Sequence, residues 1–264
     1  MAETGQLRTP SVGGPFELRP VTLLRIVLIV SVLSIWQIVA VSGWLFRDVV
    51  PSLPVIAGAL ALTLQDGSFY FNLWSTVYEI GVGLICGGSC GLAVGILLGG
   101  NRTISKSFEP LLYYLGPTPK IIFFPVMIMW FGVGPGSKMA MGAISCFFPI
   151  ALSTAAGMRQ IDAVLIRVGR SFRAGTWQMI TKIYLPAMRA PVLNGVRLGL
   201  GVALIGTLLA ETRLSNRGIG YMVIQSYNTF DMPLMYSLLI LLFMLSIGLN
   251  VVISRFAADE RTRR

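Results

Sequence analysis

Residues 80–100 read IGVGLICGGSCGLAVGILLGG, a stretch without a single charged side chain. Its 21 residues are enough for a helix to cross the hydrocarbon core of a bilayer, which needs about 20. Five glycines recur at every fourth position: Gly83, Gly87, Gly91, Gly95 and Gly99. On a helix they form one slowly turning stripe, and such stripes let helices of membrane proteins approach closely. The stretch therefore predicts a membrane-spanning helix that packs tightly against another helix.

Similar apolar stretches lie on both sides of this one. Together they predict six spans, at about residues 26–46, 80–100, 110–132, 139–158, 192–210 and 234–254. The apolar run of the third, Ile121 to Gly132, is only 12 residues long, so this span must begin near Pro110 and include Lys120. Pro117, Pro119 and Pro125 are expected to kink or break it, because proline removes a helical hydrogen bond. The pattern predicts an all-α integral membrane protein.

Composition agrees with a lipid environment. The chain is 55% hydrophobic and 12% charged, with a mean hydropathy of +0.75, whereas a soluble domain carries about 25% charged residues. Histidine is absent, which excludes Ser–His and Cys–His catalytic pairs and histidine metal sites. We therefore expect no catalytic residue, no metal and no cofactor.

The net charge of +10 is distributed in a way that favours membrane topology over nucleic-acid binding. With the N-terminus inside, sixteen Lys and Arg residues fall on the cytosolic side: Arg8, Arg19, Arg25, Arg102, Lys106, Arg159, Arg167, Arg170, Arg173, Lys182, Arg189, Arg197, Arg255, Arg261, Arg263 and Arg264. Four fall outside, namely Arg47, Lys138, Arg213 and Arg217, and Lys120 is unassigned. This bias fits the positive-inside rule. It predicts a multi-pass membrane protein with both termini cytosolic and no nucleic-acid partner.

The segments between the spans complete the expected organisation. Residues 1–25 are expected to form a cytosolic arm, 26–254 the transmembrane domain and 255–264 a basic tail. Residues 47–79 are expected to be an external loop with a short helix. Residues 101–109 and 132–138 are expected to be a polar turn and a tight outer turn.

Residues 159–189 form an unusually long, basic loop between the fourth and fifth spans. One face of a predicted helix carries its apolar residues, Ile161, Val164, Leu165, Val168 and Phe172, with arginines roughly opposite. A second short helix is expected from Trp177 to Tyr184. Such a helix pair could dock into another protein or lie on anionic lipid, and periodicity leaves both alternatives open.

Two pieces of this loop, GRSFRAGTWQ (169–178) and KIYLPA (182–187), resemble the cytosolic EAA loop of ABC importer permeases. The likeness is greatest to the branch that serves nitrate, aliphatic sulfonates, taurine and similar solutes. Other pieces of the family pattern follow in order: PSLP (51–54), QDGS (65–68), TPKI (118–121), WFGVG (130–134), FPI (148–150), GVRL (195–198), AE (210–211) and GIG (218–220). The resemblance covers roughly residues 50–255.

The resemblance implies a type I importer fold, a location in the bacterial inner membrane and a set of partners. Two permease subunits, in a homodimer or a heterodimer, form a translocation path for a small anionic solute. Two copies of a cytosolic ATP-binding subunit grip the coupling loops, and an external solute-binding protein delivers the solute. The loop residues that it implies are Arg167, Gly169, Arg170, Ser171, Phe172, Arg173, Ala174, Gly175, Leu185 and Pro186.

The loop departs from the family pattern at two positions. The family usually has Glu-Ala-Ala, three residues and then Gly, and the matching positions here hold Arg167, Val168, Gly169 and Arg173. Because glycine serves where a backbone turns or is closely approached, Arg173 predicts an altered docking geometry. The hypotheses are an ATPase with a complementary acidic groove, or pairing with a second, standard permease.

Three residues are candidates for the solute path: Lys120, Trp130 and Glu211. Ionisable residues at membrane depth often mark ion pathways, although an interfacial anchor or a packing ion pair is the simpler explanation of such residues. Aromatic residues near span ends more often form interfacial belts. The alternative to an ABC permease is a stand-alone secondary transporter or channel. An intramembrane enzyme is disfavoured by the missing histidine and the lack of paired acidic motifs.

Overall fold

The computed structural model describes residues 20–43 and 49–258. Within these residues the chain is nearly all helical and has no strand, as the apolar pattern predicted. The chain divides into two compact units, residues 1–55 and 56–264. Most of the expected N-terminal arm and the end of the basic tail lie outside the described residues.

The first unit contains helix α1, Pro20–Ser42. Its apolar residues make Val21–Ser42 a candidate membrane span, which begins earlier than the expected position 26. The following turn is fixed to this helix, because the Leu53 backbone N–H donates to Gln37 Oε1 at 2.9 Å. Helix α2, Leu53–Thr63, starts at this turn.

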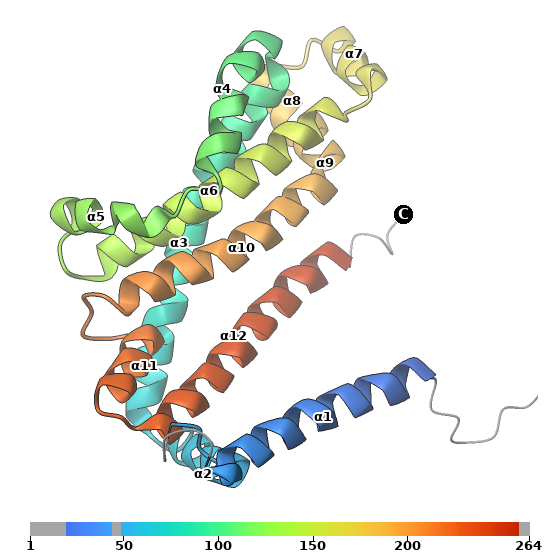
Figure 1. The fold of residues 1–264 in the computed structure, drawn as a ribbon. Coiled ribbons are helices and arrows are strands. Elements are labelled where there is room, and N and C mark those ends of the chain that lie inside the picture. The colour runs from blue at the N-terminus through green and yellow to red at the C-terminus, as the bar shows by residue number, and fades with distance from the viewer. Residues whose placement is uncertain (1–19, 44–48, 259–264) are drawn as a thin grey trace, which may run out of the picture. The chain divides into compact units, whose positions relative to one another are not determined.

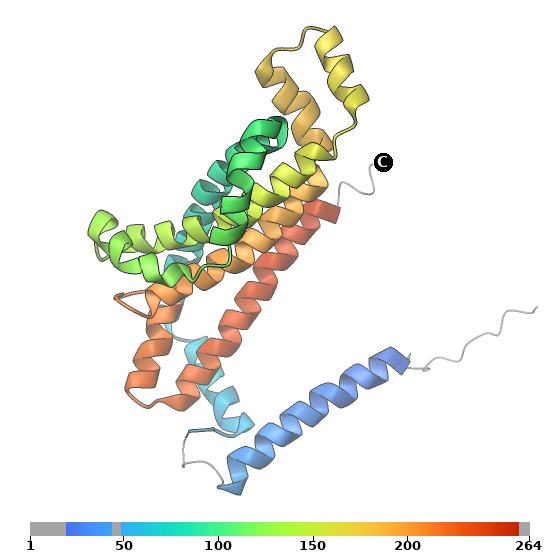
Figure 2. The same ribbon diagram turned by 45° about the horizontal axis from the view of Figure 1, so that its top comes forward.

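Three long helices form the core of the second unit: α3 (Gly67–Gly100), α6 (Pro135–Arg159) and α10 (Arg189–Glu211). Helix α6 packs against both of the others (Figures 1 and 2). A cluster of Ile80, Leu200 and Leu204 fills the contact of α3 with α10. Helices α11 (Ile219–Asn228) and α12 (Met232–Ala258) complete the unit and bury Phe69 of α3 between them.

The glycine ladder of α3 lies against α6. A Cβ added to Gly87 would lie 2.6 Å from Cα of Ala143 and closer still to the carbonyl oxygen of that residue. At Gly91 an added Cβ would lie 2.8 Å from the carbonyl oxygen of Phe147. Gly83, Gly95 and Gly99 also face atoms of α6 at distances that no Cβ tolerates. The two backbones are in direct contact along the ladder, in the manner of small-residue stripes in membrane bundles.

Helix α3 is longer than the apolar stretch from which it was predicted. It starts at Gly67, where Asp66 caps it by accepting a hydrogen bond from the Ser68 backbone N–H at 2.9 Å. Residues 67–79, expected in the external loop, are therefore helical. Residues 101–109 are not a turn, since Asn101 caps helix α4, Arg102–Leu115. Short polar side chains favour such caps because they satisfy free backbone N–H groups.

The third span is broken. Helix α4 ends at Leu115, and the 3₁₀ turn Lys120–Phe123 and helix α5, Phe124–Phe131, follow at an angle of 92°. The break contains Pro117 and Pro119, as expected, whereas Pro125 lies in the first turn of α5, where its missing N–H costs nothing. Among the residues that the structure describes, five helices are long and apolar enough to cross a membrane, and the bent pair makes up to six.

Candidate functional site

The loop between α6 and α10 folds into short helices at one end of the bundle (Figure 1). Helix α7, Ala163–Ser171, begins at Asp162, whose carboxylate accepts from the Val164 backbone N–H at 2.8 Å. Helix α8 (Thr176–Met179), the π-helical turn Ile180–Tyr184 and helix α9 (Leu185–Ala187) then lead almost without interruption to α10. Of the predicted loop residues, Leu185 and Pro186 begin α9.

Arg173 adopts the left-handed conformation, with φ of +51°. The Ala174 N–H donates to the Gly169 carbonyl oxygen at 3.0 Å, and the Arg173 N–H donates to that of Arg170 at 2.9 Å. These two bonds form the Schellman motif that ends a helix, in which glycine usually occupies the left-handed position. Arginine therefore occupies a position at which glycine is the usual residue, at a cost of about 1–2 kcal/mol.

We expect Arg173→Gly to stabilise this turn by about 1 kcal/mol, because glycine adopts the left-handed conformation without steric cost. The measurement is hydrogen exchange of the Ala174 amide, which should slow. Arg170→Gly is the matched control, since position 170 is helical and glycine there destabilises by about 1 kcal/mol. Faster exchange in Arg173→Gly would contradict the left-handed assignment.

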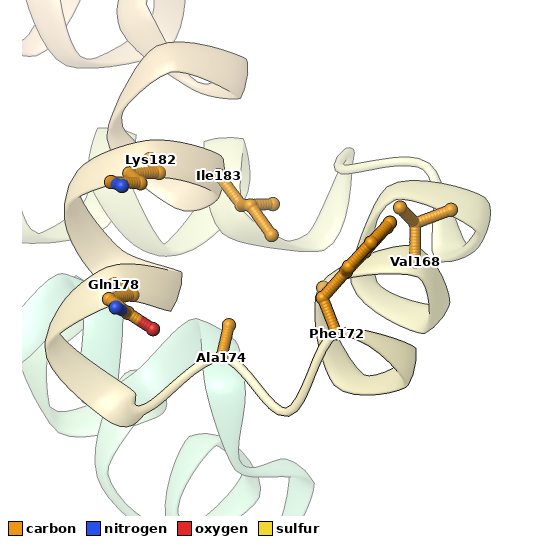
Figure 3. Close-up of a pocket in the computed structure, with 7 residues that line it drawn as sticks. Val168, Phe172, Ala174, Gln178, Lys182 and Ile183 are labelled. Carbon is orange, nitrogen blue, oxygen red and sulfur yellow. The ribbon is translucent and has the colours of Figure 1, made fainter.

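Gly169 brings α7 against the segment that follows it. This residue is buried, and an added Cβ would lie 2.6 Å from the Met179 sulfur and would overlap the Ile183 side chain. A groove of about 260 Å³ opens beside this contact. Val168 and Phe172 lie on its α7 side, and Gln178, Lys182 and Ile183 lie on the other side (Figure 3).

The surface around this groove combines exposed aromatic rings with positive charge. The side chains of Phe172 and Trp177 are 83% and 74% exposed. Arg167, Arg170 and Arg173 are exposed on and just after α7. Ser171 and Gly175 have local roles, since the Ser171 hydroxyl donates to the Arg167 carbonyl oxygen and the Gly175 N–H donates to Gln178 Oε1. Large exposed apolar residues beside a groove are typical of an interaction site.

Apart from this surface, a polar cluster is buried where α3, α6 and α10 meet the segment 212–219. Lys138 Nζ lies 3.4 Å from Glu79 Oε1, and both side chains are almost fully buried. Glu211 is also buried, accepting from the Thr76 hydroxyl and from the Gly220 N–H, both at 2.7 Å. Thr76 and Glu79 lie three residues apart on α3 and so share a face, which places Glu211 beside the Lys138–Glu79 pair. Buried charges require such partners.

Two glycines let the backbone close over this cluster. Gly218 has a φ of +108°, and an added Cβ would collide with the Glu211 carboxylate. At Gly220 an added Cβ would lie 2.8 Å from the Leu208 carbonyl oxygen. The Gly218 N–H donates to Asn72 Oδ1 at 2.7 Å. The GIG sequence at 218–220 thus fastens the segment after α10 to α3.

The structure does not bring the three path candidates together. The Lys120 ammonium group donates to the carbonyl oxygens of Gly116 and Thr118 and lies 5.1 Å from the centre of the Phe148 ring. Trp130 is 72% exposed on α5, whereas Glu211 belongs to the buried cluster. Lys120 therefore satisfies the backbone groups left free at the break, and its ammonium group has partners within the chain.

Sequence reasoning missed the role of Lys138. The outer turn was expected to extend to this residue, but α6 begins at Pro135, and Lys138 lies in its first turn, pointing at Glu79. The available signal was the pair of acidic residues, Glu79 and Glu211, at the ends of apolar stretches. Two carboxylates at such positions require a buried cation.

Comparisons with known proteins agree with this architecture. A family model described as the binding-protein-dependent transport system inner membrane component matches residues 91–263. The putative aliphatic sulfonates transport permease protein SsuC of Bacillus subtilis is 32% identical over 195 residues, 74% of this chain and 71% of that protein. The taurine transport system permease protein TauC of Escherichia coli is 30% identical over 211 residues, 78% of this chain and 76% of that protein.

A solved structure shows the same fold. A chain of the MetNI methionine ABC transporter, in an inward-facing conformation, superposes with a TM-score of 0.64 at 20% identity and covers 73% of this chain and 95% of that one. The type I importer fold expected from the sequence is confirmed. The chain therefore belongs to the family of binding-protein-dependent transport system inner membrane components, as the membrane-spanning permease subunit of an ABC importer.

Proposed function

We propose that residues 159–189 are the cytosolic element through which two copies of a separate ATPase drive this permease. Family membership implies an ATP-binding subunit and a solute-binding protein. The observation that supports this assignment is the groove beside Gly169, flanked by the exposed rings of Phe172 and Trp177. A groove between packed helices accepts an apolar side chain of a partner, and exposed aromatic residues are frequent anchors of interfaces.

The connections of this element suit it to transmit force. It joins α6 directly to α10, two of the three core helices, which pack against each other. A displacement imposed by ATP binding in the partner would therefore act on both helices at once. Such a partner biases a bundle that has two stable arrangements, one open inward and one open outward.

The positive charge of the element indicates the chemistry of the partner. Arg167 and Arg173 stand where the family usually has Glu and Gly, and both are exposed. We infer that the matching ATPase surface is acidic. Electrostatic complementarity of this kind selects the partner and raises the association rate. Pairing with a second permease that carries a standard loop is the competing arrangement.

Arg167→Glu is expected to weaken binding of the ATPase by at least about tenfold, because repulsion between the new glutamate and the acidic ATPase surface replaces the attraction of the arginine. The measurement is co-purification and binding of the chain with its ATPase at several salt concentrations. Arg213→Glu is the matched control, with the same charge change at an exposed position after α10. Unchanged binding of Arg167→Glu would argue that the arginines are incidental. Binding of the loop to anionic vesicles in place of the ATPase would support an interfacial helix.

The transported solute is proposed to be a small organic or inorganic anion of the sulfonate, taurine or nitrate class. The named relatives that transport aliphatic sulfonates and taurine support this proposal. The positive-inside count supports a cytosolic location for both termini and for residues 159–189. A second permease subunit, identical or different, would complete the path, and membrane lipid would surround the pair.

Reconstitution in proteoliposomes tests the whole assignment. The chain, its ATPase and its binding protein should take up a labelled sulfonate only when ATP is supplied. Uptake at the full rate without the ATPase would instead identify a stand-alone secondary transporter or channel. Labelling of a cysteine placed in residues 159–189 from the external face of cells would contradict the proposed orientation.

A further inference from the structure

A second ion pair lies where α6 ends and residues 159–189 begin. Arg159 donates to both carboxylate oxygens of Glu109, at 2.6 and 2.8 Å. The Ser105 hydroxyl donates to Glu109 Oε2 at 2.6 Å and lies 3.2 Å from the Arg159 guanidinium group. Two parallel hydrogen bonds between a guanidinium and a carboxylate fix the direction of the contact as well as its distance.

Arg159 and Glu109 lie on different helices, one at the end of α6 and the other in α4. Arg159 is the last residue of α6, where the coupling loop, residues 159–189, begins. Glu109 lies in the middle of α4, the first half of the broken span, and none of the α4 residues is fully buried. Helix α4 thus makes only shallow packing contacts, while the Ser105–Glu109–Arg159 cluster ties it to the end of α6.

The Arg159–Glu109 pair is in contact with solvent, which limits its contribution to the stability of the fold. The Arg159 side chain is 41% exposed and that of Glu109 is 13% exposed. Ion pairs in contact with water contribute little to the free energy of unfolding, because solvent screens them and their side chains lose entropy. A bidentate pair still holds two helices in a defined register. Its loss should therefore alter the movement of α4 more than the stability of the fold.

We propose that Glu109 and Arg159 are positioning residues that transmit the displacement of the coupling loop to α4 and, through the break at 116–119, to α5. This proposal rests on the proposed function of residues 159–189. When the ATPase displaces the loop, the end of α6 moves, and the bidentate pair carries α4 with it. Without the pair, ATP hydrolysis continues while α4 and α5 follow the loop less strictly.

The test is the amount of solute transported per ATP hydrolysed by the reconstituted complex. Glu109→Gln and Arg159→Gln should each assemble with the ATPase and retain its basal hydrolysis, but reduce this ratio by about tenfold, a usual size for coupling between sites. The charge exchange Glu109→Arg with Arg159→Glu should recover most of the loss. Lys106→Gln, a charge removal at an exposed position of α4 outside the cluster, should leave the ratio unchanged.

The outcomes distinguish this proposal from the one on which it rests. An unchanged ratio in both single variants would overturn the role of the pair, as would a charge exchange that behaves no better than they do. A fall in transport that only follows a loss of assembled complex would assign the pair to stability and overturn the proposal. Wild-type complex that hydrolyses ATP without any ATP-driven uptake would overturn the proposed function itself.

Discussion

Replacing Lys138 by methionine should destabilise the protein by about 3–5 kcal/mol, the usual cost of removing one partner from a buried ion pair. Methionine keeps an unbranched apolar side chain, one atom shorter than that of lysine, but carries no charge. Glu79 and Glu211 would then share a buried site without a cation. The Arg217 carbonyl oxygen would also lose the lysine ammonium group, which lies 3.4 Å from it. The measurement is equilibrium unfolding of the purified protein in mixed detergent micelles.

Two further variants separate charge from packing at this site. Lys106→Met makes the same substitution at an exposed position of α4 and should change the free energy of unfolding by less than about 0.5 kcal/mol. Glu79→Gln in the Lys138→Met background removes one of the two carboxylates and should recover part of the lost stability. If the double variant is less stable than Lys138→Met, the lysine acts through packing and the ion-pair explanation is wrong.

The spans could be predicted from the sequence because lipid imposes a strong constraint on composition. A helix that crosses a bilayer must be apolar over about 20 residues, and that pattern needs no knowledge of its neighbours. The ends of the helices could be predicted less well from the sequence. Residues 67–79 contain Glu79 and several polar side chains. They become helical because Asp66 caps them and because Thr76 donates to Glu211 of α10 and accepts from the Ile219 N–H of α11.

The candidate site also has features that the sequence predicts and features that it does not. Residues 163–171 have a clear helical period, so the first loop helix was predictable. The conformation of Arg173 was not, because a non-glycine residue at positive φ depends on the hydrogen bonds that the completed turn supplies. Pairs such as Lys138 with Glu79 join residues 59 positions apart. A single sequence contains no information on which cation meets which acid.

Gly87→Ala should destabilise the protein by about 3 kcal/mol, at the upper end of the range for overpacking. The glycine lies in the middle of the ladder, and an added Cβ would lie 2.6 Å from Cα of Ala143 in α6. A flexible side chain can move aside, but a backbone atom of a packed helix cannot. Helices α3 and α6 would have to separate along the contact that forms the core of the bundle, which weakens the contacts of the neighbouring glycines as well.

Gly81→Ala in the same helix is the matched control. No atom of the described residues lies within 4 Å of a Cβ added there, so alanine should stabilise α3 by up to about 1 kcal/mol through its higher helix propensity. The two identical substitutions, six positions apart, should therefore shift the unfolding midpoint in opposite directions. An equal shift in both variants would mean that helix propensity alone decides the result. That result would exclude close packing of the α3 backbone on the α6 backbone, because such packing makes a substitution at position 87 more destabilising than one at position 81.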